Sequence, residues 1–458
     1  MHRLVFALVC VAASLALASC GESGPRTTNG RTEIVFWHSM GGVNGDALQR
    51  MANGFNASQD AYHVRPVFQG GFPDSLKKLV SSFGTDSMPA LIQLDDIQLR
   101  FMVDSQATVP LQDFIDLEDA TSAAMQGYPP AVDLADFEPR ALAYYSLEGR
   151  LRAMPFNLSG PVLYYDKDAF REAGLDPERP PTTFDEVRDY SERLLRRDQG
   201  GGVTRNGVAL NISAWYFEQM LAKQGALYAN NGNGREGLAT EVRFDGAEGE
   251  EILTWWQEMV DSGLATNVGQ QGLQALLSVL SGKSAMAIES TAAMRSVLLA
   301  LGPGAARFGA GPLPAPYSPD GGIVIGGAAA WIISDRPDIE QRGGWEFLKY
   351  ATRPDIQAQW HVDTGYFPVR VSAWDMEPAA SLHRDVPQFT AARAQLLGSP
   401  LNLVTAGAVI GPFTQVRESV IEALEQVLVG DKEPREALDD AAADANRAIE
   451  RYNRSVTE

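Results

Sequence analysis

Residues 33–37, EIVFW, begin the run of alternating patterns that decides the fold. This short, mostly apolar run predicts a strand. It is followed by an amphipathic helix pattern over 45–57, an alternating strand pattern over 63–68, a helix pattern over 74–83 and another apolar run over 90–94. Strand, helix and strand in this order predict an α/β layer with parallel strands.

A second set of patterns follows further along the chain. Strands are predicted over 160–165 (GPVLYY), 285–288 and 322–333, helices over 167–173, 184–197, 250–260 and 273–280, and a glycine-rich loop over 199–207. From 337 onward, helix patterns dominate to the end of the chain. Because 458 residues are too many for one ordinary hydrophobic core, we expect at least two domains.

The composition is that of a soluble globular protein with an acidic surface. Hydrophobic residues make up 45% and charged residues 21% of the chain, and the formal net charge is −20. A surface of this sign repels the phosphate backbone of nucleic acids and is unlike a basic membrane-surface binder. We therefore expect neither nucleic acid nor an anionic lipid surface as a partner.

The N-terminus has the features of a secretory signal. His2 and Arg3 precede an apolar run over 4–17, which is shorter than the roughly 20 residues that a spanning helix needs. The run ends in LASC at 17–20, which matches a lipoprotein lipobox. We predict a signal peptide over 1–19 and a lipid on Cys20. The alternative is an ordinary signal peptide with a cysteine there by chance.

The segment after the lipobox predicts a tether. Residues 21–32 (GESGPRTTNGRT) are polar and rich in Gly, Ser, Thr and Pro, so we expect 20–32 to be a flexible lipidated link to the cell membrane. The chain has only two cysteines, Cys10 and Cys20, and Cys10 lies within the signal. The exported protein is therefore expected to have no disulfide, although its compartment is oxidising.

Motifs for catalysis or for a metal are missing from the sequence. The five histidines have no HExxH spacing and no cysteine beside them, and there is no GxSxG motif. Residues 281–284 (SGKS) resemble the end of a phosphate-binding loop, but Leu277 stands where that loop needs glycine. We expect a protein that is not an enzyme and uses no metal and no cofactor.

Small and polar residues stand where strands are predicted to end or begin. Asp96 follows the run over 90–94, Ser159 precedes the strand at 161, Ser290 follows the strand over 285–288, and Gly327 lies in IVIGGAAAW. In open α/β sheets, ligands bind beyond the carboxyl ends of the strands. Each residue alone is more typical of a turn or a cap, but their shared placement favours a ligand cleft.

Arg417 lies on the apolar face of a predicted helix. In TQVRESVIEALEQVL it precedes Ile421 by one turn, and that face continues through Leu424 and Leu428. A guanidinium on a buried face needs an anionic partner, either a ligand or a carboxylate. The alternative is an arginine that reaches solvent at the helix end or pairs with a surface acid.

Seven segments carry a family resemblance. The chain resembles the sn-glycerol-3-phosphate-binding proteins of ABC importers, and the segments occur in that family's order over nearly the whole mature chain. They are FWHSM at 36–40, PALIQL at 89–94, PFN at 155–157, PVLYYDKDAF at 161–170, AGLDPERPPTTF at 173–184, IGGAAAW at 325–331 and WHVDTGYFPV at 360–369. GLDPERPP and TGYFPV are the more specific parts, whereas YYDKDAF is shared with sugar-binding relatives.

The resemblance implies a periplasmic-binding-protein fold. Two α/β lobes, each a mainly parallel sheet flanked by helices, would close over a ligand in the cleft between them. The N-terminal lobe is expected over 33–154 and about 309–352, and the C-terminal lobe over 155–308 and about 353–458. The family's ligand contacts correspond to Phe72, Asp96, Ser159, Ser290, Gly327, Tyr366 and Arg417.

Some positions differ from the family pattern. Phe72 stands where tyrosine is usual and lacks its hydroxyl, Leu158 and Gly160 replace polar residues, and 207–216 does not match the family's Trp-rich stretch. Phe184 and Trp215 are candidates for the wall of the pocket. A wider pocket would suit a glycerophosphodiester such as glycerophosphocholine.

The resemblance also implies a function and partners. We expect a monomeric lipoprotein outside the cytoplasm that binds a glycerophosphate-type ligand and delivers it to the permease and ATPase subunits of an ABC importer. The alternatives are a binder of neutral sugars on the same fold, an exported glycerophosphodiesterase, and a surface lipoprotein that only docks other proteins.

Overall fold

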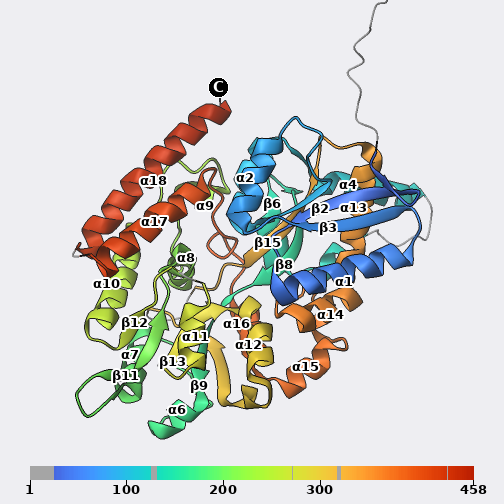
Figure 1. Cartoon of the computed structure of the whole chain (residues 1–458). Coiled ribbons are helices and arrows are strands. Elements are labelled where there is room, and N and C mark those ends of the chain that lie inside the picture. The colour runs from blue at the N-terminus through green and yellow to red at the C-terminus, as the bar shows by residue number, and fades with distance from the viewer. Residues whose placement is uncertain (1–24, 125–131, 271, 317–320, 431, 458) are drawn as a thin grey trace, which may run out of the picture.

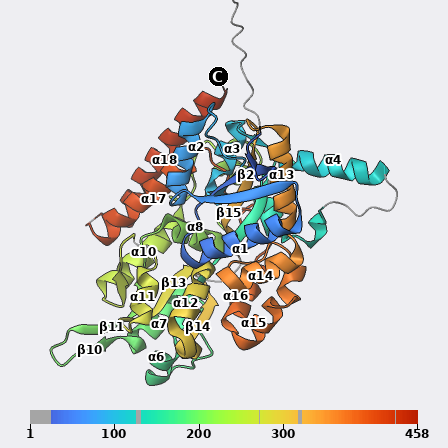
Figure 2. The ribbon, with the colours of Figure 1, turned by 45° about the vertical axis from the view of Figure 1, so that its right-hand side comes forward.

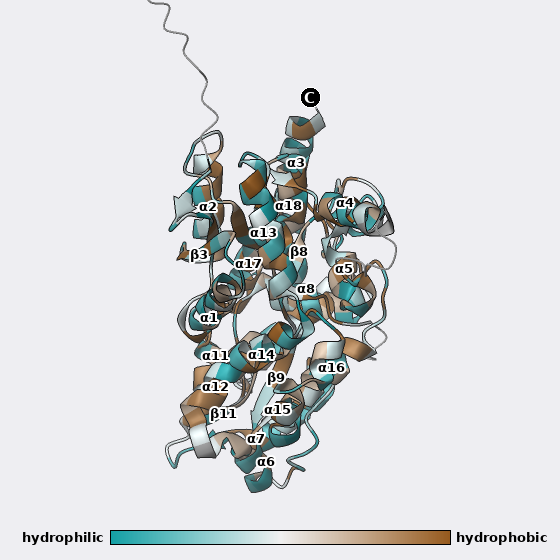
Figure 3. Cartoon of the chain, turned by 90° about the vertical axis from the view of Figure 1, so that its right-hand side faces the viewer, coloured by the Kyte–Doolittle hydropathy of each residue, from teal (hydrophilic) through white to brown (hydrophobic). Residues whose placement is uncertain are grey.

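The computed structural model describes residues 25–124, 132–270, 272–316, 321–430 and 432–457, and its strands form two separate main sheets. One sheet lies in the upper half of Figure 1 and the other in the lower half. Seen from the side, the chain is elongated, with α2 and α3 near one end and α6 and α7 at the other (Figure 3). The fold is therefore the expected two-lobed α/β arrangement.

The first sheet has seven strands. Its order is β1-β2-β4-β15-β5, with β3 beside β2 and β8 beside β15. The parallel pairs are β2 with β3 and β2 with β4, whereas β15 runs antiparallel to β4, β5 and β8. Its strands are β1 (Thr27–Thr28), β2 (Arg31–His38), β3 (Tyr62–Phe68), β4 (Leu91–Asp95), β5 (Thr108–Val109), β8 (Met154–Ser159) and β15 (Gly326–Ile333).

The apolar runs at the start of the chain form the centre of this sheet. Ile34, Phe36, Leu91 and Ile92 are fully buried, as their positions in near-continuous apolar strands predict. The flanking helices are α1 (Gly42–Ser58), α2 (Phe72–Ser82), α3 (Leu99–Asp104), α4 (Leu111–Ala124), α5 (Pro139–Tyr145) and α13 (Asp338–Ala351). Of these, α4 projects from the body of the lobe (Figure 2).

The second sheet has six strands in the order β10-β11-β13-β9-β14, with β12 beside β11. β11 is parallel to β12 and β13, and β9 is antiparallel to β13 and β14. Each main sheet thus has two parallel pairs, around β2 and around β11, and its remaining pairs, including the hairpins β1–β2 and β10–β11, are antiparallel, so the sheets are mixed rather than mainly parallel as expected. The strands are β9 (Pro161–Asp166), β10 (Arg196–Arg197), β11 (Val203–Leu210), β12 (Ala265–Asn267), β13 (Ser284–Ser290) and β14 (Phe308–Pro312).

Side-chain caps begin two helices of the second lobe. The Asp166 carboxylate accepts from the N–H groups of Asp168 and Ala169 at the start of α6, and Thr183 caps α7 in the same way.

The helices of the second lobe are α6 (Lys167–Glu172), α7 (Phe184–Leu194), α8 (Ala214–Lys223), α9 (Asn230–Gly234), α10 (Ala247–Asp261), α11 (Gln274–Leu280), α17 (Phe413–Leu428) and α18 (Pro434–Thr457). The remaining helices are α12 (Met294–Leu301), α14 (Pro354–Thr364), α15 (Ala379–Asp385) and α16 (Gln388–Gly398).

Three local predictions were wrong. Residues 203–207, expected in a glycine-rich loop, belong to β11, because Val203 and Arg205 pair with β10 and Asn206 pairs with β13. Residues 322–325 were expected in a strand but precede β15, which begins at Gly326. The helix expected over 184–197 ends at Leu194.

The first described residues also differ from the expected tether. β1 pairs antiparallel with the first residues of β2, and the Arg26 N–H donates to the Glu340 carboxylate at 2.9 Å. Residues 26–32 are therefore attached to the first lobe rather than flexible. The predicted signal peptide and Cys20 lie outside the described residues. Within the described part of the chain, no helix is both long and apolar enough to cross a bilayer.

Strand pairing locates the crossings between the lobes. β8 stays in the first sheet up to Ser159, beyond the expected boundary at 154. β14, at 308–312, lies in the second sheet although 309 was expected to begin a return to the first lobe. We therefore propose that the first crossing is at Gly160 and the return lies within 313–325.

Candidate functional site at the junction of the lobes

The first crossing brings together three predicted site residues. β8 ends at Ser159 and β9 begins at Pro161, so this connection between the two sheets is the single residue Gly160. Ser159 pairs with Gly326 at the start of β15, and Pro161 pairs with Ser290 at the end of β13. Ser159, Ser290 and Gly327 therefore meet where the chain passes from one lobe to the other.

Gly327 has a conformation that only glycine adopts without strain. Its φ is +119°, and a Cβ added there would lie 1.9 Å from the carbonyl oxygen of Asn157. The main chain of β15 thus approaches β8 more closely than any side chain would allow. The packing of β15 on β8 therefore requires glycine here, and a role of its N–H group in ligand binding stays a prediction.

Tyr366 reaches the same place from the end of α14. Gly365 ends that helix in the left-handed conformation, with φ +86°, and the next residues turn back so that the Phe367 N–H donates to Leu158 O at 2.7 Å. The Tyr366 ring stacks on Trp360 at 6.2 Å, and burial raises the pKa of Tyr366 to about 12. Its phenol is therefore neutral and available for hydrogen bonding.

Arg417 is held by acidic side chains from two other elements. Its Nη2 donates to Glu218 Oε2 of α8 at 2.7 Å, and its Nη1 lies 4.0 Å from Asp96 Oδ1. The Arg417 side chain is 16% exposed, and its guanidinium lies 5.2 Å from the centre of the Phe413 ring. The prediction that this guanidinium has an anionic partner is confirmed, and the partner is a carboxylate.

Asp96 comes from the first lobe. It begins the short 3₁₀ turn η1 (Asp96–Gln98) directly after β4, and its carboxylate accepts from the Ile97 N–H at 3.0 Å. Burial raises the pKa of Asp96 to about 7, with Arg417 opposing and the Glu218 charge adding to the shift. Asp95 is also largely buried, and its pKa is raised by the same cause. Arg417 opposes the pKa shift of both aspartates, so both lie close to this cation.

Two buried tyrosine hydroxyls border this charged group. The Oη atoms of Tyr144 and Tyr228 have no hydrogen-bond partner within the described residues. Burial, together with the negative charge of Glu218, raises the pKa of both phenols. Because a buried hydroxyl without a partner costs free energy, these groups are open to a ligand or to ordered water.

Trp215 also lies at the junction. It is in the first turn of α8, and a Cβ added at Gly326 would lie 2.7 Å from its indole ring. The ring therefore packs directly against the strand that contains Gly327. The sequence placed Trp215 only as a candidate wall, and the structure places it beside the predicted contacts.

Of the other two predicted residues, Phe184 is not brought to this group, and no contact among the described residues places Phe72 in it. Phe184 is 3% exposed and stacks on Trp255 at 3.8 Å inside the second lobe. Phe72 is the first residue of α2, is partly exposed, and takes part in no aromatic pair among the described residues. The structure thus gathers Asp96, Ser159, Trp215, Ser290, Gly327, Tyr366 and Arg417, with Glu218 in addition.

Comparison with known proteins identifies the family. The model of the family described as bacterial extracellular solute-binding protein matches residues 50–386. The sn-glycerol-3-phosphate-binding periplasmic protein UgpB of Escherichia coli K12 is 31% identical over 97% of this chain and 98% of its own, and UgpB of Shigella flexneri serotype 5b shows the same values. This chain belongs to the bacterial extracellular solute-binding proteins.

Solved structures of solute-binding proteins share the fold. The crystal structure of UgpB from Mycobacterium tuberculosis in complex with glycerophosphocholine has a TM-score of 0.75 at 21% identity, covering 92% of this chain and 99% of that one. The cyclic α-maltosyl-1,6-maltose binding protein from Arthrobacter globiformis has a TM-score of 0.72 at 23% identity, covering 92% and 100%. The resemblance inferred from the seven segments is confirmed.

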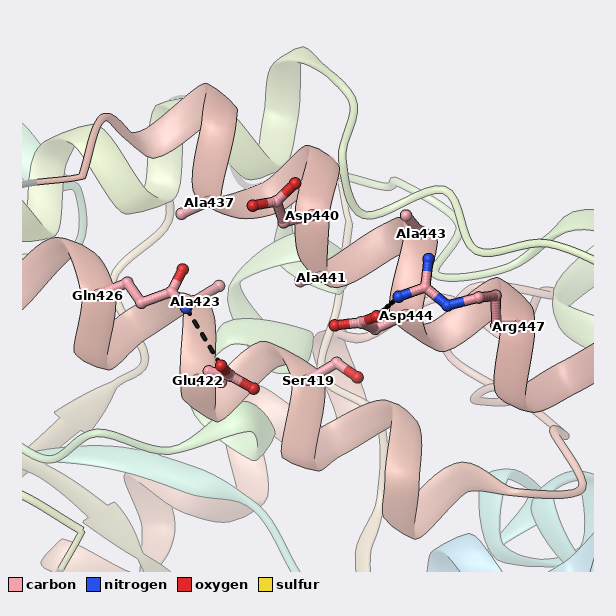
Figure 4. Close-up of a pocket in the computed structure, with 10 residues that line it drawn as sticks. All are labelled: Ser419, Glu422, Ala423, Gln426, Ala437, Asp440, Ala441, Ala443, Asp444 and Arg447. Carbon is pink, nitrogen blue, oxygen red and sulfur yellow. Dashed lines mark hydrogen bonds and ion pairs between the residues drawn. The ribbon is translucent and has the colours of Figure 1, made fainter.

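A well-formed cavity of this solute-binding protein lies away from the junction. It has a volume of about 310 Å³ between α17 and α18, lined by Ser419, Glu422 and Gln426 of α17 and by residues of α18 (Figure 4). At 100° per residue, these α17 positions face away from Arg417. The cavity is therefore an outer groove that contributes no atom to the predicted site.

Sequence reasoning missed three residues of the site in this solute-binding protein. Glu218 is 3% exposed in AWYFEQMLAK, so an acid among apolar residues was a signal that could have been read. Tyr144 and Tyr228 gave no such signal, because buried tyrosines are common in any core. Their partners are remote in sequence, and only the fold shows that they meet.

Proposed function

We propose that this protein is the substrate-binding component of an ABC importer and captures sn-glycerol-3-phosphate or a glycerophosphodiester such as glycerophosphocholine. Two relatives that are 31% identical over 97% of the chain are named as sn-glycerol-3-phosphate-binding proteins, which supports this ligand class. The observation that carries the proposal is the largely buried Arg417 between acids of different lobes. A guanidinium is the side chain best suited to a phosphate group.

The site offers both types of contact that a glycerophosphate needs. Arg417 and the hydroxyls of Ser159, Ser290 and Tyr366 would bind phosphate oxygens, and Asp96 would accept hydrogen bonds from glycerol hydroxyls. The main-chain N–H of Gly327 would add a fixed donor. A handful of such bonds accounts for roughly −8 kcal/mol, which corresponds to micromolar affinity.

Contacts from both lobes would couple binding to closure. Asp96 and Ser159 belong to the first lobe, and Ser290 and Arg417 to the second. A ligand that touches all four is bound more tightly in the closed arrangement, and so shifts the population toward it. The closed form would then be the one that the permease recognises.

A calorimetric ligand panel tests this function. The panel contains sn-glycerol-3-phosphate, glycerophosphocholine, inorganic phosphate and maltose, and the compounds are recovered afterwards to check for hydrolysis. We expect intact glycerophosphate compounds to bind with micromolar affinity and maltose not to bind. Binding of maltose alone would support a neutral-sugar binder, and hydrolysis would indicate an enzyme.

We further propose that the exported chain is a monomeric lipoprotein with its lipid on Cys20. The LASC sequence at 17–20 supports this, since it has the small residues and the cysteine that lipid attachment requires. Labelling cells with a palmitate analogue should mark the wild type and not the Cys20→Ser variant. Equal labelling of the two would rule out Cys20 as the acceptor.

A further inference from the structure

The guanidinium of Arg417 already has a counter-ion. Glu218 Oε2 accepts a hydrogen bond from Arg417 Nη2 at 2.7 Å, which uses one of the five N–H donors of the guanidinium. Arg417 Nε is buried and has no hydrogen-bond partner within the described residues. A phosphate can therefore bind the remaining N–H groups, but it shares the positive charge of Arg417 with Glu218.

Glu218 is held firmly in this position. Its neighbour Gln219 accepts from the Val324 N–H at 3.0 Å and donates to Val324 O at 2.9 Å, which fixes α8 to the segment that returns between the lobes. On the other side, the Tyr216 hydroxyl donates to Glu289 at 2.9 Å. With α8 anchored on both sides, the Glu218 carboxylate stays close to Arg417 whether or not a ligand is present.

The charges around Arg417 do not favour a simple anion. One guanidinium faces the carboxylates of Glu218, Asp96 and Asp95, all of which are at least largely buried. Arg417 and these carboxylates together have no net positive charge, and the whole chain has a formal net charge of −20. An anion gains little from entering such a site unless other contacts stabilise it.

We propose that Glu218 is the resident counter-ion of Arg417 and the residue that sets selectivity among anions. This inference rests on the proposed function. An anionic ligand binds Arg417 beside Glu218 only when its hydroxyl groups also bind Asp96 and the surrounding serines and tyrosines. Inorganic phosphate has no hydroxyl-bearing carbons and therefore binds more weakly, although its oxygens can form the same bonds to Arg417.

The test compares Glu218→Gln with wild type for sn-glycerol-3-phosphate and inorganic phosphate by calorimetry. Glutamine has the same shape without the charge, so Arg417 is released to the ligand. We expect at least tenfold tighter binding of inorganic phosphate, and the gain should vanish in the double variant Glu218→Gln, Arg417→Gln. Glu340→Gln is the matched control, since Glu340 forms a buried pair with Arg336 at 2.9 Å in the first lobe.

The outcomes separate the two proposals. If wild type binds sn-glycerol-3-phosphate but Glu218→Gln binds both anions with equal or lower affinity, Glu218 is not a competing counter-ion and only this inference fails. If no protein in the set binds any phosphate compound, the proposed function fails and the inference with it. Should Glu218→Gln not fold, Glu218→Asp, whose shorter side chain withdraws from Nη2, is expected to give the same gain.

Discussion

Arg235, the residue that follows α9, donates a hydrogen bond from Nη2 to the main-chain oxygen of Tyr144 at 3.2 Å, and so joins the second lobe to the end of α5 in the first. The same guanidinium donates to Ala143 O at 2.9 Å and to Gly407 O at 2.7 Å. Tyr144 borders the charged group around Arg417. Arg235 therefore links the two lobes by hydrogen bonds close to the proposed site.

Removing the hydrogen bonds of Arg235 should destabilise the protein. In Arg235→Ala, the carbonyl oxygens that Arg235 binds lose their donor, and we expect the free energy of unfolding to fall by about 3 kcal/mol. Urea denaturation measures the change. The control is Arg171→Ala, which removes an exposed pair with Asp168 and should cost less than about 1 kcal/mol. Equal effects of both variants would contradict the proposed role of Arg235.

Gly327→Ala should disrupt the junction. The new Cβ would lie 1.9 Å from Asn157 O, on a main chain with φ +119°. We expect a loss of about 3 kcal/mol or more in unfolding free energy, and weaker ligand binding in any protein that folds. Gly398→Ala, where a Cβ meets no atom within 4 Å, should change stability by less than about 0.5 kcal/mol. A stable Gly327→Ala protein with normal affinity would show that β15 can move away from β8.

Trp215 should report ligand binding by its fluorescence. Its indole packs against Gly326 beside the predicted contacts, whereas Trp255 is stacked on Phe184 within the second lobe. Adding sn-glycerol-3-phosphate should change the emission of wild type and of Trp255→Phe, but much less that of Trp215→Phe. If the change persists in Trp215→Phe and disappears in Trp255→Phe, the ligand lies elsewhere in the second lobe.

His361 should make stability fall at mildly acidic pH. It is fully buried, and its Nδ1 lies 2.6 Å from Tyr366 O and its Nε2 2.9 Å from His383 Nε2. Burial lowers its pKa to about 3, with the charges of His383 and Arg393 acting in the same direction. The unfolded chain takes up this proton near pH 6.5, so the native state loses stability as pH falls from about 6.5 toward 3.

The variant His361→Asn isolates this effect. Asparagine can still donate to Tyr366 O but does not titrate, so the wild type should lose about 2 kcal/mol more than the variant between pH 7 and pH 5. Asp96, with its pKa raised to about 7, acts in the opposite sense in both proteins and cancels in the comparison. Parallel pH profiles of wild type and variant would mean that His361 takes up its proton at the same pH in the native state as in the unfolded chain.

Local patterns predicted most of the elements near the site. The apolar runs at 33–37, 90–94 and 160–165 correspond to β2, β4 and β9, since continuous apolar residues favour buried strands. The antiparallel pairing of β15 with β8 could not be predicted in this way, because those partners are more than 160 residues apart and no local pattern records them. The start of β11 was missed because the glycines at 200–202 and 207 indicate a loop, whereas the local pattern does not record the pairing with β10 and β13.

The site was predicted in part. The helix pattern placed Arg417 on an apolar face and so required an anionic partner, which the structure supplies. It could not name Glu218, 199 positions away, because the pairing depends on how α8 and α17 pack together. The roles of the predicted residues in binding a ligand remain predictions until a ligand is measured.

The most direct measurement is the affinity of Arg417→Gln for sn-glycerol-3-phosphate, compared with that of wild type and of Arg336→Gln. Arg336 is the matched control, because it too forms a buried pair with a glutamate, far from the junction in the first lobe. We expect Arg417→Gln to bind at least tenfold more weakly, a difference of about 1.4 kcal/mol, and Arg336→Gln to bind as wild type does. A folded Arg417→Gln protein with wild-type affinity would contradict the account.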